Sequence, residues 1–184
     1  MNLKIASSNL NQTPLAWEKN FSNIRNSIND ARKKNVKILC FPELSITGYS
    51  CQDLFFNSWF INKSEKYLKE VVKLCDGMTV LIGHPLKYSG KLYNAVSIIK
   101  NKEIKGCFIK SNLPNDGIHY EKRWFEPWRL GEIKEHIFDK KKVPIGTIQY
   151  EFSDSLTLGF EICRDSWDSE RPAKYIRTKK NLLI

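Results

Sequence analysis

The sequence lacks the features that mark several large classes of protein. No stretch approaches the ~18 consecutive apolar residues that a membrane-spanning helix needs, so no membrane association is predicted. The N-terminal segment becomes polar at Ser7, too early for a secretory signal peptide. No internal repeat, low-complexity stretch or linker divides the chain. These absences predict one domain, residues 1–184, in the cytoplasm.

Cysteine and histidine are few and scattered. The five cysteines form no CxxC pair and their number is odd, which without an export signal predicts free thiols rather than a disulfide framework. Cysteines in apolar runs usually act as small buried hydrophobes, the role expected of Cys40, Cys75 and Cys107. The three histidines lie far apart, so neither a zinc site nor any other metal site is predicted.

Positive charge is in excess, with a formal net charge of +10. Nucleic-acid binders concentrate such charge on one face or interleave it with exposed aromatic residues. Here the lysines are spread along the chain, and the one dense run, residues 140–142, is short. The pattern predicts a solvated lysine-rich surface and no nucleic-acid partner. A non-catalytic basic protein that binds nucleic acid or a partner chain remains an alternative.

Apolar runs of strand length alternate with segments of helical periodicity. Helices are expected over residues 13–35 and 59–75, with a last helix starting at Asp168 or Ser169 and reaching Ile176. Strands are expected at residues 4–10, 36–41, 78–83, 92–99, 104–109, 144–152, 156–163 and 181–184. Because a hairpin joins two of these strands, the alternation predicts an α/β layered domain with mixed sheets.

Three chemically useful side chains follow strands: Glu43, Lys110 and Cys163. Strand ends at one edge of a sheet converge, so these side chains are expected to meet. A carboxylate can take the thiol proton and later give it to a leaving amine. An ammonium favours the thiolate and stabilises an oxyanion. The set predicts cleavage of amide or nitrile C–N bonds through a thioester, with no metal or organic cofactor.

Three segments resemble motifs of the carbon–nitrogen hydrolases of the nitrilase superfamily. Residues 41–44 resemble the glutamate motif, residues 109–115 the lysine motif and residues 159–163 the nucleophile motif. Three motifs in the right order are far more specific than any one alone. The resemblance implies a nitrilase-like α-β-β-α sandwich. It also implies that Glu43 is the general base, Lys110 the oxyanion-stabilising group and Cys163 the nucleophile.

The flanking segments resemble the glutaminase domains of glutamine-dependent NAD synthetases. They are residues 49–55, 115–128 and 165–167. The resemblance implies glutamine as substrate, with Glu121 as a second glutamate that positions substrate and lysine. It places Tyr49 and an aromatic loop containing Tyr120, Trp124 and Phe125 around the glutamine pocket.

That family's architecture sets further expectations. It implies that the sandwich is incomplete at its C-terminal end, and that a C-terminal synthetase domain, which uses ATP, is normally fused. A homo-oligomer is expected of the complete enzyme. Arg164 departs from the family pattern, which commonly has an acidic residue after the cysteine.

Other interpretations stay open at this point. A stand-alone amidase acting on another small amide is the second functional hypothesis, beside the basic binding protein. Glu121 has the alternative of a surface ion pair with Lys122 or Arg123. His119 is expected to be part of the loop structure rather than an acid–base group.

Overall fold

The computed structural model describes residues 3–175 and 181–183. Its first half contains β1 (Ile5–Ser7), α1 (Trp17–Lys33), β2 (Ile38–Cys40), the 3-10 helix η1 (Gln52–Phe56), α2 (Ser58–Leu74), β3 (Thr79–Tyr88) and β4 (Lys91–Lys100). Its second half contains β5 (Glu103–Ile109), α3 (Glu121–Trp124), β6 (Ile133–Phe138), β7 (Lys141–Gly146), β8 (Tyr150–Ser153), β9 (Leu156–Gly159), the 3-10 helices η2 (Cys163–Ser166) and η3 (Pro172–Tyr175), and β10 (Asn181–Leu183).

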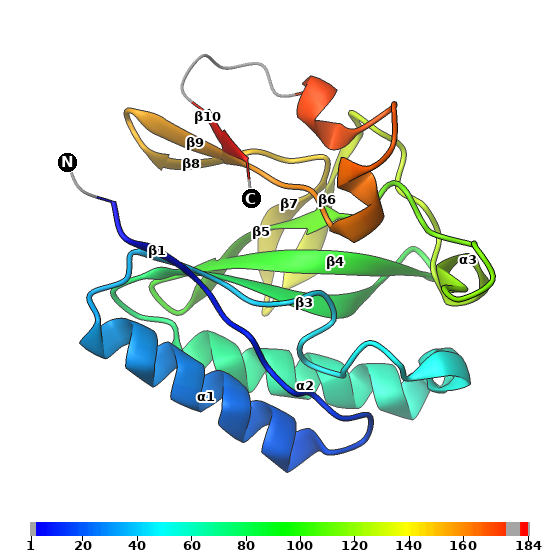
Figure 1. The fold of residues 1–184 in the computed structure, drawn as a ribbon, viewed down its shortest axis with the longest axis horizontal. Helices are drawn as coiled ribbons and strands as arrows, with labels where there is room; N and C mark the ends of the chain where they lie inside the picture. Colours follow the sequence, from blue (N-terminus) through cyan, green and yellow to red (C-terminus); the bar gives the residue numbers. More distant parts are fainter. Residues whose placement is uncertain (1–2, 176–180, 184) are drawn as a thin grey trace.

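These elements stack in layers (Figure 1). Helices α1 and α2 cover one face of a seven-stranded sheet with the order β1-β2-β3-β4-β5-β7-β6, and the sheet β10-β9-β8 lies over its other face. Strands β1, β2 and β3 are parallel, whereas β3, β4 and β5 form antiparallel hairpins. The expected α/β architecture with mixed sheets is confirmed.

Apolar cores on both faces of the large sheet hold the layers together. Helical spacing puts Ile24 and Ile28 of α1, and Leu68 of α2, against the large sheet. A separate core between the sheets joins Phe108 to Phe160, whose ring centroids are 5.8 Å apart. Burying a side chain of this size contributes about 1.5–3 kcal/mol. The inter-sheet core therefore fixes the segment after β9 over the ends of the strands below it.

Several elements differ from the sequence prediction. Strand β3 continues past residue 83 to Tyr88, and a tight turn with positive φ at Ser89 and Gly90 leads into β4. Strand β6 was not predicted, because most of its residues are exposed and it lacks an apolar run. The segment 144–152 contributes to two strands in different sheets, β7 and β8. Strand β7 ends at Gly146, whose φ is +119°, and β8 begins at Tyr150.

The last third of the chain also differs. The predicted strand 156–163 ends at Gly159, so Cys163 is not a strand-end residue. The predicted last helix is the short 3-10 helix η3, and Ile176 lies outside the described residues. The strand expected at 181–184 is β10, although Ile184 is also outside them. No helix among the described segments is long and apolar enough to cross a bilayer.

Candidate active site

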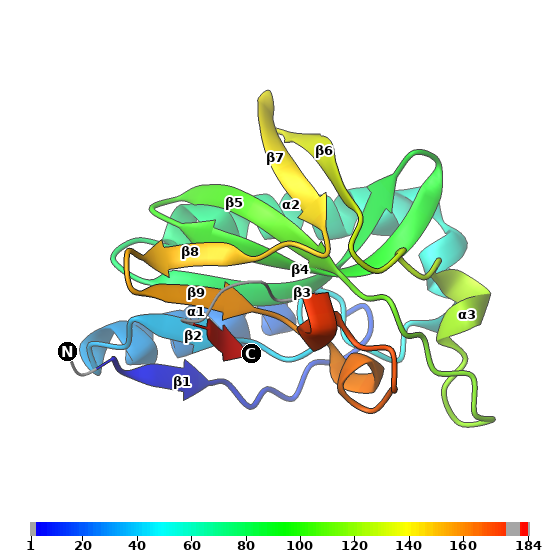
Figure 2. The same cartoon turned by 90° about the horizontal axis from the view of Figure 1, so that it is seen from above.

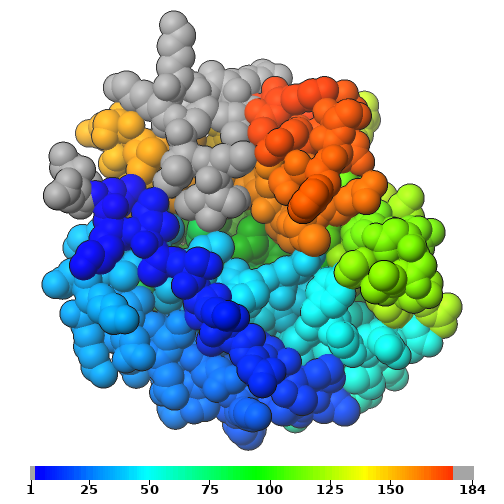
Figure 3. Space-filling view, in the orientation of Figure 1, coloured from blue at the N-terminus to red at the C-terminus, as the bar shows by residue number. Residues whose placement is uncertain are grey.

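Beyond the ends of β2, β5 and β9, the chain runs into loops and short helices on one side of the molecule (Figure 2). These segments carry the three predicted residues. Glu43 lies three residues after β2, and Lys110 directly follows β5. Cys163 begins η2, four residues after β9 in the smaller sheet. On the surface, the segments around η1, α3 and η2 lie next to one another (Figure 3). The large sheet thus supplies the carboxylate and the lysine, and the small sheet supplies the thiol.

A buried lysine is the centre of the site. Lys110 is completely buried, and its Nζ lies 2.6 Å from Oε1 of Glu43. The same Nζ lies 2.7 and 2.8 Å from the two carboxylate oxygens of Glu121. Glu121 is itself buried, so it is not the surface partner of Lys122 or Arg123 that the sequence left open. One ammonium is held between two carboxylates.

Two neutral side chains extend this network. The Asn94 amide on β4 donates to Oε1 of Glu43 at 2.7 Å and to Oε2 of Glu121 at 3.4 Å. The Tyr49 hydroxyl donates to Oε1 of Glu121 at 2.6 Å. The Asn94 donor favours the ionised form of Glu43, because a hydrogen bond to the charged form stabilises that form.

The Glu43 loop is pressed against β3. Gly83 faces the loop so closely that a Cβ there would come nearer than 3.0 Å to backbone atoms of Leu44, Pro42 and Glu43. The Ile46 amide also donates to the Gly83 carbonyl at 3.2 Å. The absence of a side chain at this position lets the loop lie flat on the sheet and fixes the backbone that carries the carboxylate.

Cys163 occupies a sharp turn. Its φ is +46°, a left-handed value that is uncommon for a residue other than glycine and often marks a functional site. It is the exposed cysteine of the five, and Cys51, Cys75 and Cys107 are buried. Cys40 is partly buried. The turn presents the thiol to solvent, whereas β9 itself is largely buried.

Asp165 fastens this turn to the lysine segment. Its Oδ1 accepts the backbone N–H groups of Ser111 at 3.1 Å and Asn112 at 2.8 Å. Its Oδ2 accepts the backbone N–H of Ile162 at 3.1 Å. The carboxyl is fully buried, and burial raises its pKa to about 6, although these donors pull the other way. A single side chain thus spans the two segments that carry Cys163 and Lys110.

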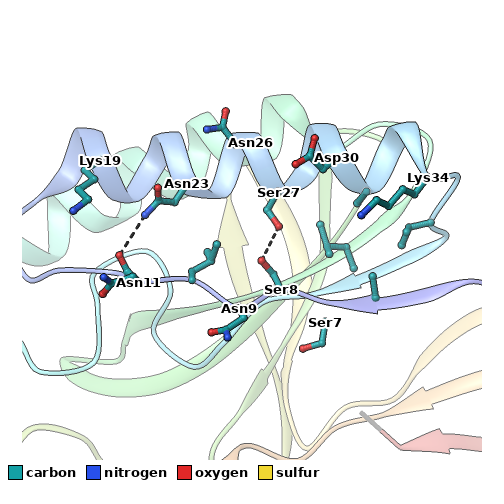
Figure 4. Close-up of a pocket in the computed structure, with 15 residues that line it drawn as sticks. Ser7, Ser8, Asn9, Asn11, Lys19, Asn23, Asn26, Ser27, Asp30 and Lys34 are labelled. Carbon is teal, nitrogen blue, oxygen red and sulfur yellow. Dashed lines mark hydrogen bonds between the residues drawn. The ribbon is translucent and has the colours of Figure 1, made fainter.

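A small pocket connects the thiol and the carboxylate. Cys163, Glu43 and Asn94 are among the residues that line a volume of about 120 Å³. This is room for several water molecules or a small amide head group, and less than the ~300 Å³ or more of a site for a drug-sized ligand. A larger hollow of about 530 Å³ lies between the segment after β1 and α1 (Figure 4). Its lining includes Ser8 and Ser27 but neither Glu43 nor Cys163.

The surroundings set the protonation of the three groups. Burial raises the pKa of Glu43, and the Lys110 ammonium offsets part of that rise. Burial alone would lower the pKa of Lys110, but the two carboxylates outweigh it and the pKa lies above its usual value. Burial and Glu43 raise the pKa of Cys163, although Lys110 pulls it down. The expectation that the ammonium favours thiolate therefore holds for Lys110 alone and not for the site as a whole.

The residues predicted to bind substrate fall into two groups. Tyr49 and Glu121 belong to the lysine network. Tyr120 is half exposed on the loop before α3. Trp124 and Phe125 pack on Phe55 of η1 instead, and the Trp124 indole donates to Asp53 at 2.9 Å. Neither of these two lines the Cys163 pocket, so their role at a glutamine pocket stays a prediction without a contact to support it.

Sequence reasoning missed Asn94 and Asp165 as members of the site. Asn94 lies in an apolar strand pattern that also contains Ser97, and a polar residue within such a run was the available signal. Asp165 follows the cysteine by two residues, a spacing typical of a side chain that caps the turn it belongs to. Within residues 3–175 and 181–183, no cluster of three or more His, Cys, Asp and Glu is placed to hold a metal ion. The prediction that catalysis needs no cofactor stays a prediction.

A buried lysine held between two carboxylates thus lies near an exposed thiol on a left-handed turn, where two stacked sheets meet. The chain belongs to the carbon-nitrogen hydrolase family, whose sequence profile matches residues 4–183. This confirms the family resemblance and the nitrilase-like fold inferred from the three motifs.

Within this family, the chain is clearly similar to glutamine-dependent NAD(+) synthetases. The chain is 32% identical to a glutamine-dependent NAD(+) synthetase from Arabidopsis thaliana, over 89% of its own length and 24% of the relative's. The crystal structure of a glutamine-dependent NAD(+) synthetase from Cytophaga hutchinsonii matches 88% of the chain and 28% of that protein, with 40% identity and a TM-score of 0.85. An amidase from Nesterenkonia sp. shares the fold, with a TM-score of 0.60, 16% identity, and coverage of 89% of the chain and 56% of the amidase. The chain thus spans about a quarter of the length of the NAD(+) synthetases it matches.

Proposed function

We propose that the chain hydrolyses the side-chain amide of glutamine through a thioester on Cys163. The observation that carries the proposal is the Lys110 ammonium held between Glu43 and Glu121, next to the pocket that Cys163 lines. The similarity to glutamine-dependent NAD(+) synthetases supports glutamine as the substrate. The small pocket volume suits a carboxamide head group.

Acylation begins with a protonated thiol. Because the pKa of Cys163 is raised, Glu43 takes the thiol proton as the sulfur attacks the amide carbon. The carbonyl oxygen becomes an oxyanion, and the Lys110 ammonium stabilises its charge. Glu43 then gives the proton to the amide nitrogen, the C–N bond breaks, and ammonia leaves a thioester on Cys163.

Deacylation uses the same groups in reverse order. Glu43 takes a proton from water as the water oxygen attacks the thioester carbon. Collapse of the second oxyanion breaks the C–S bond, and the proton returns from Glu43 to the sulfur. Glutamate leaves, and the thiol and carboxylate are restored.

The names of the relatives suggest how the released ammonia is used. Their names describe glutamine-dependent NAD(+) synthesis, so we propose that the released ammonia serves NAD synthesis in a synthetase region that uses ATP. We propose, as the family resemblance implies, that this region is fused C-terminally to the chain; the greater length of the relatives supports this.

Ammonia release tests the reaction. The purified chain is given glutamine, asparagine or propionamide, and ammonia is measured for the wild type, Cys163→Ala and, as a matched thiol control, Cys75→Ala. We expect release from glutamine, a loss of at least about 10³-fold in Cys163→Ala, and little change in Cys75→Ala. Release that persists in Cys163→Ala contradicts the mechanism. A preference for propionamide favours the stand-alone amidase.

A further inference from the structure

The buried amide of Asn94 is the polar group beside the catalytic set to which nothing so far gives a function. Its side chain is fully buried on β4, and Asn94 does not belong to any of the three family motifs. The antiparallel pairing of β4 with β5 brings it next to the lysine, because the Lys110 backbone N–H donates to the Asn94 carbonyl at 2.9 Å. The same ladder therefore fixes Lys110 and Asn94 side by side.

The amide is oriented by its charged neighbours. Its Nδ2 donates to Glu43 at 2.7 Å and, more weakly, to Glu121 at 3.4 Å. Within the described part of the chain, the buried Oδ1 of Asn94 has no hydrogen-bond partner. Leaving a buried acceptor unsatisfied is costly, by about 1–3 kcal/mol. Rotating the amide by 180° would point its oxygen at the two carboxylates, and the electrostatic repulsion would cost more than the unsatisfied acceptor does.

We propose that Asn94 is a positioning residue that holds the Glu43 carboxylate in its ionised, base-competent form and in line with Cys163. Lys110 alone cannot do both, since its charge is shared between Glu43 and Glu121. The Asn94 amide donates a second hydrogen bond, from a neutral group, to the same Glu43 oxygen that accepts from Lys110. The Asn94 side chain acts through Glu43 and contacts no reacting atom. This proposal rests on the proposed function for its kinetic test.

The charged and titratable groups around Glu43 come from four segments. Lys110 follows β5, Glu121 belongs to α3, Cys163 begins η2, and Tyr49 lies in the loop after β2. None of them is altered in an Asn94 variant. The hydrogen bond from Asn94 is one of the contacts that lower the pKa of Glu43 against the effect of burial. Removing it should raise that pKa and leave less carboxylate at neutral pH.

The test compares Asn94→Asp, which keeps the shape of the side chain, and Asn94→Ala with Ser97→Ala. Ser97 is a matched control because it is a buried polar residue of β4 that bonds to His84, outside the catalytic set. We expect kcat to fall ~10- to 100-fold in both Asn94 variants with KM changed less than about threefold. The acid limb of kcat/KM should move to higher pH, because the base is then protonated over a wider range. Asp165 titrates alike in all variants, so only the difference from the wild type is compared.

A second readout does not depend on turnover. The free energy of unfolding of Asn94→Asp, relative to the wild type, should fall as pH rises from 5.5 to 8.5, because a third carboxylate ionises beside two others. Ser97→Ala should show a constant difference over this range. A pH-independent loss of rate with an unmoved acid limb, as for a merely structural residue, overturns the proposal. If the wild type releases no ammonia, the proposed function fails, and the unfolding measurement still decides whether Asn94 acts on the carboxylates.

Discussion

At the scale of single residues, the position of one proton decides how the site works. Burial and two carboxylates keep the pKa of Cys163 above its usual value, so the resting sulfur is a thiol. Lys110 stays an ammonium because the same carboxylates surround it. In the proposed mechanism, Glu43 therefore removes this proton during the reaction, and the Lys110 ammonium acts on the oxyanion.

Replacing Glu43 by Gln separates these two effects. We expect turnover to fall by ~10²- to 10⁴-fold, because the general base is lost. Alkylation of Cys163 by iodoacetamide at pH 7.5 should become faster, because removing the Glu43 charge lowers the pKa of the thiol. Rates are measured by mass spectrometry of the Cys163 peptide, with Cys163→Ser as the blank. A slower alkylation in Glu43→Gln would show that the carboxylate favours thiolate and contradict the scheme.

At the scale of elements, the position of η2 depends on one buried carboxyl. Asp165 joins the turn of Cys163 to the segment after β5 through three backbone hydrogen bonds. Its folded-state pKa of about 6 lies above the ordinary value of 3.8. The folded protein therefore holds this proton more tightly than the unfolded chain, and ionising the group costs stability as pH rises from 3.8 to 6, by about 3 kcal/mol in all.

Asp165→Asn should reveal this cost. The amide never ionises, so the free energy of unfolding of the variant should gain on that of the wild type as pH rises from 4 to 7. The variant also loses the acceptor for the Ile162 N–H, which should loosen η2 and lower kcat ~10- to 100-fold. Urea unfolding at several pH values measures the first effect and ammonia release the second. A stability difference that does not change with pH would mean that Asp165 does not titrate in this range.

The contact between β3 and the Glu43 loop gives another prediction at this scale. Gly83→Ala places a Cβ against the backbone of Pro42, Glu43 and Leu44, so the loop must move away from the sheet. We expect a loss of about 1–3 kcal/mol in unfolding free energy and a fall in kcat. Gly90→Ala is the control, since its φ of +78° makes the variant strained but no atom lies within 4 Å of the added Cβ. Equal activity per folded molecule in the two variants would argue against this packing role.

How far the elements were predictable depended on their burial. The apolar runs that became β2, β3 and β5 were recognised, and they correctly placed Glu43 and Lys110 after strands. The turn of Cys163 was mistaken for a strand end, because Phe160 and Ile162 continue the apolar pattern while packing between the sheets. Strand β6 has no apolar run to mark it. Asn94 acquires its role through pairing with the lysine segment, a tertiary contact that its strand does not encode.

At the scale of the whole molecule, the sandwich brings two sheets together so that each supplies part of the site. The large sheet positions Glu43 and Lys110. The inter-sheet core, in which Phe108 packs against Phe160, positions the segment that carries Cys163 relative to them. The formal charge of +10 is carried largely by exposed lysines, several of which form surface ion pairs. Such pairs contribute little to stability, about 0–1 kcal/mol each. The homo-oligomer implied by the family stays a prediction that light scattering can test.

The most direct test of the account is labelling with an electrophilic analogue of glutamine, a diazoketone in place of the amide. We predict one analogue per chain, on Cys163, with protection by excess glutamine and a rate at least ~100-fold lower in Lys110→Met, where the oxyanion loses its cation. Mass spectrometry of the digested chain gives the site and the rate. Labelling of Cys163 no faster than Cys51, or without protection by glutamine, would contradict the claim that Glu43, Lys110 and Cys163 form one working site.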